Sequence, residues 1–200
     1  MVTAAEHRTL QVIRGIGVVR PADLERYGIP RQRMYRLVRK GQVTRHARGV
    51  YAATDHPFTA DHSLAQVAKR VPAGVICLLT ALRFHGLTTQ DPGEVWLALP
   101  EKARKPKLDR PRLRITRFSG PALSEGVEAH RIEGVHVRIY SAAKTVADCF
   151  KYRNKVGVDV AVEALRDFSR RFRGGATDLA RFARICRVTR VMQPYLDAIA

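Results

Sequence analysis

Acidic residues are scarce in this sequence of 200 residues: 18 Asp and Glu stand against 36 Lys and Arg, a net charge of +18. The composition is otherwise globular, 46% apolar and 27% charged, which excludes a mainly disordered chain. A positive excess on a folded protein indicates a polyanionic partner, with nucleic acid the first candidate and an anionic membrane surface the second. Arginine dominates the excess and suits bidentate contacts to phosphate and guanine.

Cysteine is also scarce. Cys77, Cys149 and Cys186 are far apart in the sequence, and no CxxC or CxxxH spacing occurs. This pattern argues against a disulfide framework and against a structural zinc site. We expect three small buried side chains in a reducing cytoplasm, and neither a metal nor a cofactor.

Long apolar runs are missing. The longest, residues 73–82, is about half of the ~18 residues that a membrane span requires, and Arg83 closes it. Glu6, His7 and Arg8 occupy positions where a signal peptide would be apolar. The sequence therefore predicts a cytoplasmic protein with no membrane partner.

Positive charge is concentrated at the two ends of the chain. Residues 1–55 contain 11 Lys and Arg against 4 Asp and Glu, and residues 141–200 contain 12 against 6. A linker-like stretch, residues 53–57, follows a self-contained pattern of elements. We therefore predict two domains, 1–55 and 56–200.

Three short helices are predicted in the first domain. The first spans about residues 4–14 and begins with a capping box formed by Thr3 and Glu6. A second begins near Pro21, and a third runs over residues 31–40. This order is typical of a helix-turn-helix.

The third helix separates an apolar stripe from a basic face. Met34, Leu37 and Val38 fall within the stripe and are predicted to join the core. The remaining positions carry long donors and an amide, as a helix in the DNA major groove needs. These predicted DNA-binding residues are Arg31, Gln32, Arg33, Tyr35, Arg36, Arg39 and Lys40.

A basic hairpin is predicted after the third helix. Residues 43–45 form one strand, 49–52 the return strand, and 46–48 the tip. A hairpin in this place is a wing, which would lie over the DNA backbone or the minor groove. The wing residues predicted to bind DNA are Arg45, His46 and Arg48.

The second domain mixes strand and helix patterns, which predicts a small sheet flanked by helices and an α+β fold class. The predicted strands are residues 95–99, 113–118 and 135–140. The predicted helices are 60–71, 74–85, one capped by Ser141, 158–172, one capped by Thr177 or Asp178, and one over 191–199.

No catalytic constellation is evident in the sequence. The seven histidines lack HxxxH or HxE spacing, and no glycine loop with a phosphate-binding lysine occurs. Lys144, Asp148 and Lys151 share one helix face, where we expect a row of surface ion pairs. We therefore expect no enzyme, with neither catalytic nor metal-binding residues.

Two stretches of the sequence carry a family resemblance. Residues 15–52 contain Leu37-Val38-Arg39-Lys40-Gly41 followed by Arg48-Gly49-Val50-Tyr51. Residues 137–166 contain Ser141-Ala-Ala-Lys-Thr-Val-Ala-Asp148, then Val156-Gly157 and Glu163-Ala164-Leu165. Together they resemble the AbiEi antitoxin family of type IV toxin–antitoxin systems. The resemblance covers most of the chain and is diffuse between about residues 87 and 130.

The resemblance implies a DNA-binding transcriptional repressor of its own promoter. It also implies a C-terminal domain that counteracts a cognate nucleotidyltransferase-like toxin. One winged helix covers few bases, so we expect two copies, dimerising on an inverted repeat of double-stranded DNA.

Alternatives stay open at this point. The chain could be a DNA nuclease targeted by its winged helix, or a stand-alone winged-helix transcription factor without a toxin. Lys102, Arg104, Lys105 and Lys107 form either a solvated loop or an additional phosphate or toxin contact. The arginine-rich C-terminal helices are either solvated or a second DNA surface.

Overall fold

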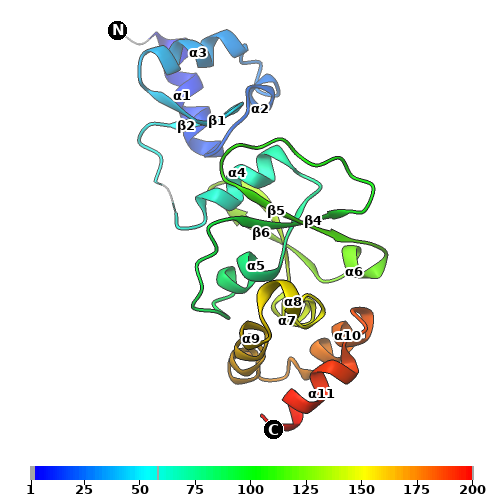
Figure 1. Cartoon of the computed structure of the whole chain (residues 1–200). Coiled ribbons are helices and arrows are strands. Elements are labelled where there is room, and N and C mark those ends of the chain that lie inside the picture. The colour runs from blue at the N-terminus through cyan, green and yellow to red at the C-terminus, as the bar shows by residue number, and fades with distance from the viewer. Residues whose placement is uncertain (1–2, 58, 200) are drawn as a thin grey trace. The chain divides into compact units, whose positions relative to one another are not determined.

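The computed structural model describes residues 3–57 and 59–199, which cluster into two compact units (Figure 1). The first unit consists of Met1–Ala73, Pro106–Arg112 and His130–Val137. The second unit consists of Gly74–Lys105, Leu113–Ala129 and Arg138–Ala200. No helix in the described part of the chain is long and apolar enough to cross a membrane.

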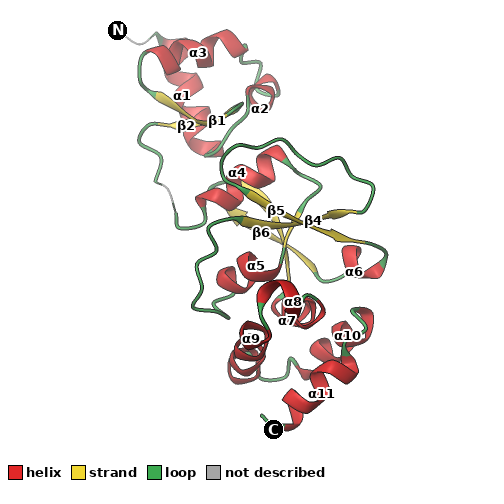
Figure 2. Ribbon diagram, viewed as in Figure 1, coloured by secondary structure: helices red, strands yellow, loops and turns green. Residues whose placement is uncertain are grey.

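Both units combine helices with strands, so the predicted α+β class is confirmed (Figure 2). The elements of the first unit up to residue 73 are α1 (Ala4–Ile16), α2 (Pro21–Glu25), α3 (Arg31–Arg39), β1 (Val43–Ala47), β2 (Val50–Ala53) and α4 (His62–Arg70). Three helices followed by a two-stranded antiparallel sheet give the winged helix-turn-helix arrangement that the sequence predicts.

The start of α1 is the predicted capping box. The Thr3 hydroxyl accepts a hydrogen bond from the Glu6 amide at 3.2 Å, and the Glu6 carboxylate accepts one from the Thr3 amide at 2.8 Å. Two amides at the helix start are thereby satisfied. At the other end Gly17 terminates the helix with a φ of 85°.

A small apolar core holds these helices against the wing. It consists of Leu10, Ile13, Val19, Leu24, Ile29, Met34, Leu37, Val43, Tyr51 and Ala53. Met34 and Leu37 are fully buried and Val38 is half-buried, which confirms the predicted apolar stripe of α3. Because these side chains face inward, the rest of α3 faces outward.

The tip of the wing differs from the prediction. Strand β1 continues through His46 to Ala47, with an irregular register between Arg45 and Ala47, and the turn is confined to Arg48 and Gly49. Gly49 has a φ of 76°, which glycine adopts without steric cost and which permits the tighter turn. The wing also contacts the chain before α2, through antiparallel pairing of Val19 with Tyr51.

The compact unit around the wing extends beyond residue 55. It includes α4 and the later segments Pro106–Arg112 and His130–Val137. The predicted domain boundary between residues 55 and 56 refers to which part of the chain folds independently. That boundary stays a prediction.

A five-stranded sheet organises the second unit, in the order β5-β4-β3-β7-β6. The strands are β3 (Val75–Ile76), β4 (Val95–Pro100), β5 (Leu113–Phe118), β6 (Val127–Ile132) and β7 (Val135–Tyr140). Strand β4 pairs parallel with β5 and antiparallel with β3, which pairs parallel with β7. Residues 130–137, where β6 turns into β7, cluster with the first unit.

The helices of the second unit are α5 (Leu78–Phe84), α6 (Pro121–Ser124), α7 (Ala142–Lys151), α8 (Arg153–Val156), α9 (Val158–Arg171), α10 (Ala176–Ile185) and α11 (Thr189–Asp197). The helix predicted over residues 74–85 is confirmed for Leu78–Phe84 but wrong at its start, because Val75 and Ile76 form a strand paired with Ala98 and Leu97. A short apolar run does not by itself distinguish a buried strand from a buried helix. The sequence prediction also missed α6 and β6, and it capped α10 with Thr177 or Asp178 although Gly175 is the N-cap.

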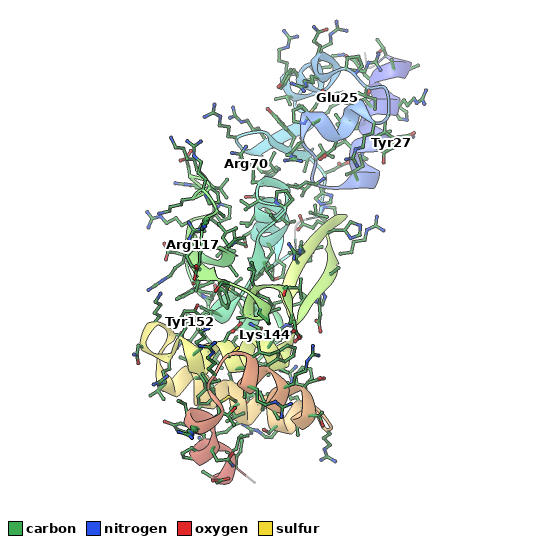
Figure 3. The ribbon with its side chains drawn as sticks, turned by 90° about the vertical axis from the view of Figure 1, so that its right-hand side faces the viewer. Glu25, Tyr27, Arg70, Arg117, Lys144 and Tyr152 are labelled. Carbon is green, nitrogen blue, oxygen red and sulfur yellow. The ribbon has the colours of Figure 1, made fainter. Side chains whose placement is uncertain are left out.

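The expected row of surface ion pairs on α7 is also wrong. Lys144 and Asp148 are both fully buried and form an ion pair at 2.5 Å, whereas Lys151 is exposed (Lys144 is labelled in Figure 3). Helix α7 packs against α5, α9 and α10, so its polar face is covered. The three cysteines are buried and unbridged, as predicted.

Candidate nucleic-acid interface

Helix α3 presents its polar face to solvent. Six of the seven predicted positions are exposed and Arg33 is half-buried. The exposed residues are Arg31, Gln32, Tyr35, Arg36, Arg39 and Lys40. The amphipathic separation therefore leaves four arginine and lysine heads, one amide and one phenol available on one helix, together with the flanking Arg33.

Two of these cations are paired with carboxylates of neighbouring helices. The Arg31 guanidinium lies 2.7 Å from a Glu25 carboxylate oxygen, and both side chains are exposed. The Lys40 ammonium lies 2.8 Å from the Glu6 carboxylate, whose side chain is almost buried. Hydrogen bonds from Lys40 and from the Thr3 amide outweigh burial and lower the pKa of Glu6 to about 2. Lys40 thus fastens the end of α3 to the start of α1.

Tyr35 connects α3 with the wing. Its ring meets the ring of Tyr51 edge-on, with centroids 6.2 Å apart. Tyr51 is buried, and burial together with Tyr35 raises its pKa. Since Tyr35 is 44% exposed, the same side chain both packs against β2 and faces outward.

The three predicted wing residues differ in exposure. Arg45 and Arg48 are exposed, and Arg45 Nε donates to the Ala47 carbonyl at 3.4 Å. His46 is half-buried, with its ring 5.2 Å from the ring of His62. Burial and the neighbouring His62 lower the pKa of His46, so its neutral form is favoured.

A buried carboxylate that no sequence pattern indicated lies under the wing. The Glu133 side chain is 1% exposed and accepts hydrogen bonds from the Thr59 amide at 2.7 Å and from His62 Nδ1 at 2.6 Å. Its burial raises the pKa, but the hydrogen bonds from His62 and Thr59 outweigh this effect and lower it. Gln66 Nε2 donates in turn to His62 Nε2 at 2.6 Å.

The backbone at Glu133 is equally constrained. Its carbonyl accepts from the Val18 amide at 3.4 Å, and a Cβ at Gly17 would lie only 2.1 Å from that carbonyl oxygen. Glu133 itself has a φ of 48°, an uncommon value for a residue with a side chain. Alternating patterns on both sides of Glu133-Gly134 could have indicated a hairpin turn there. They could not have indicated its partners, which lie more than seventy residues away.

The described residues offer little for metal or thiol chemistry. Within residues 3–57 and 59–199, no group of three His, Cys, Asp or Glu side chains is placed to hold a metal ion. Burial raises the pKa of the Cys77 and Cys149 thiols well above the ordinary value, which disfavours the nucleophilic thiolate.

A family model described as "Transcriptional regulator, AbiEi antitoxin" matches residues 7–54. The match runs from within α1 to the residue after β2 and includes every predicted DNA-binding residue. No curated protein matches the chain. The resemblance described for residues 15–52 is thereby confirmed, whereas that for residues 137–166 stays a prediction.

Proposed function

We propose that this chain is a transcriptional regulator of a toxin–antitoxin system that binds double-stranded DNA through α3 and the β1–β2 wing. The observation that carries the proposal is the arrangement of α3, whose apolar residues lie in the core while its arginines and Gln32 face outward beside the wing. The match of residues 7–54 to a transcriptional regulator family supports it.

The side chains divide by reach into two groups. Residues toward the start and the middle of α3 approach base edges in the major groove: Arg31, Gln32, Arg33, Tyr35 and Arg36. Those near its end and on the wing contact phosphates: Arg39, Lys40, Arg45 and Arg48. The His46 ring packs against the His62 ring, and in this proposal that contact positions the wing for its phosphate contacts.

In this proposal the regulator acts by occupying its own promoter as two copies on an inverted repeat. The C-terminal domain, residues 56–200, by family resemblance counteracts a nucleotidyltransferase-like toxin in the cytoplasm. The sequence supports this antitoxin role through the Ser141–Asp148 pattern at the start of α7.

The test of the DNA function is a fluorescence-anisotropy titration of the full chain on its own promoter and on a scrambled duplex, at several salt concentrations. A chain with charge +18 binds any DNA at low salt, so binding alone is uninformative. We expect the promoter to keep an advantage of at least ~10³ at physiological salt. Equal affinities throughout the series would overturn the proposal.

The antitoxin role needs a separate experiment. The full chain is co-expressed with its proposed cognate nucleotidyltransferase-like toxin, and growth is compared with that of cells that express the toxin alone. Restored growth is expected. Unchanged toxicity would leave a transcription factor without antitoxin activity.

A further inference from the structure

A basic groove lies beside the wing in the first unit. It encloses about 500 Å³ and is lined by five cationic side chains and one carboxylate. These are Arg45, Arg48, Arg70, Lys107 and Arg110, together with Asp109. Two of the cations belong to the wing, one to the end of α4, and two to the segment Pro106–Arg112.

Arg70, which is labelled in Figure 3, joins the walls of this groove through two hydrogen bonds. Its Nη1 donates to the Arg48 carbonyl at 2.5 Å, and its Nη2 donates to the Lys107 carbonyl at 3.5 Å. The next residue toward the start of α4, Lys69, lies 2.8 Å from the Asp23 carboxylate of α2. The helix that carries Arg70 is therefore fixed to the helix-turn-helix, and the distant segment is fixed to the wing.

The net positive charge of the groove favours binding of an anion. Five cations share one opening with a single carboxylate, and neither the Arg48 nor the Lys107 carbonyl removes any of the Arg70 charge. Repulsion between like charges held on fixed elements is relieved when a polyanion binds, since its phosphates replace the counterions. Regularly spaced monovalent phosphates match a row of guanidinium and ammonium groups.

The composition of the lining favours a duplex backbone over a single strand. Proteins bind single strands by stacking bases on aromatic rings. In the part of the chain that the structure describes, the lining of this groove contains no aromatic side chain. Moreover, the groove begins at Arg45 and Arg48, which already belong to the proposed phosphate contacts of the wing.

We propose that this groove binds the phosphodiester backbone of the same DNA duplex, next to the wing, so that Lys107 and Arg110 extend the interface. Arg70 is a positioning residue that keeps the distant segment against the wing turn. The inference rests on the proposed DNA-binding function. It adds to that function a second phosphate-binding element, the segment Pro106–Arg112, which lies some sixty residues beyond the wing turn in the sequence.

The experiment compares two double variants of the full chain that remove equal charge. Lys107→Ala with Arg110→Ala empties the groove of two cations, whereas Lys102→Ala with Lys105→Ala removes two from the same basic stretch outside the lining. Affinity is measured by fluorescence anisotropy on the promoter and on a scrambled duplex as salt is varied. Circular dichroism melting verifies that each variant is folded.

The groove variant should lose up to about 2 from the magnitude of the slope of log K against log salt, since each phosphate contact contributes about 0.9. The slope should fall by the same amount on both duplexes, and the variant should keep its preference for the promoter. The control variant should follow the wild type. Equal slopes for the two double variants would overturn the inference.

Failure of the proposed function has a different signature. If the wild type shows no promoter preference, the regulator function fails, yet the scrambled duplex still tests the groove through the difference in slope. If the preference is present and the two double variants behave alike, only the groove inference fails. Arg70→Lys keeps the positive charge but loses the pair of hydrogen bonds to the Arg48 and Lys107 carbonyls. It should therefore weaken binding to both duplexes equally, because Lys107 is displaced.

Discussion

The Lys144 ammonium lies 2.5 Å from a carboxylate oxygen of Asp148, one turn further along α7, and neither side chain is exposed to solvent. The other Asp148 oxygen accepts from the Cys186 thiol at 3.1 Å, and the ammonium lies 4.2 Å from the centre of the Tyr140 ring. The second unit therefore contains a buried ion pair within α7, whose two charged groups also contact the Tyr140 ring and the Cys186 thiol.

Removing one partner of this pair should destabilise the fold strongly, because the other charge would stay buried without compensation. We expect Lys144→Met to lower the free energy of unfolding by about 3–5 kcal/mol. The double variant Lys144→Met with Asp148→Leu should recover most of that loss. Chemical denaturation measures both, with Lys151→Ala on the exposed end of α7 expected to stay within about 0.5 kcal/mol of the wild type. Additive losses in the double variant would contradict the coupling.

The outward face of α3 should determine affinity for the promoter. Gln32→Ala or Arg36→Ala is expected to weaken specific binding by ~1–3 kcal/mol, because base contacts are lost while the fold is retained. Anisotropy titration on the promoter tests this, with Arg8→Ala on the exposed face of α1 as the control for the loss of one positive charge. Met34→Asp should instead unfold the first unit, since it places a charge in the core. Wild-type promoter affinity in both alanine variants would refute the assigned face.

Neighbouring cations at the end of α3 should behave differently. Arg39 is exposed, whereas the Lys40 ammonium is held by Glu6. We therefore expect Arg39→Ala to reduce the salt slope by up to about 1, and Lys40→Ala to reduce it less while lowering the melting temperature. Glu6→Gln should lower the melting temperature but leave the slope at or above its wild-type value. Identical salt slopes for Arg39→Ala and Lys40→Ala would show that the ion pair with Glu6 does not reduce the contribution of Lys40 to DNA binding.

The network under the wing should make the first unit sensitive to acid in two steps. Because the pKa of His46 is lowered in the fold, the unfolded chain takes up the proton first, and stability falls as the pH drops below about 6.5. The pKa of Glu133 is also lowered, so its stabilising contribution is present above the ordinary value of 4.5 and is lost as the pH falls through the lower folded value.

Two variants separate these steps in urea unfolding at a series of pH values. His46→Phe should flatten the dependence of stability on pH just below about 6.5, since it removes the first titration. Glu133→Gln should be less stable at neutral pH and flatter below about 4.5. Unaltered pH dependence in both variants would contradict the role of the network.

Local spacing alone was enough to predict much of the first unit. The capping box of Thr3 and Glu6 and the division of α3 into core and exposed faces follow from residues within one or two helical turns of each other. The alternating strand β5 and the uniformly apolar strand β4 were likewise predicted correctly. In α3 and β5 the period of the apolar residues determines which face is buried, and in β4 the absence of polar residues indicates burial on both faces.

Tertiary structure decided what depends on partners far away in sequence. Val75 and Ile76 became a strand because Leu97, Ala98 and Ile139 offered pairing edges, which no local pattern records. Lys144 and Asp148 followed the spacing of a surface ion pair, yet three helices cover them. The contacts of Glu133 with Thr59 and His62, and those of Arg70 with Arg48 and Lys107, join segments that the sequence keeps apart. Spacing along the chain thus determined the elements and their faces, while burial and proximity came from packing, which brings distant residues together.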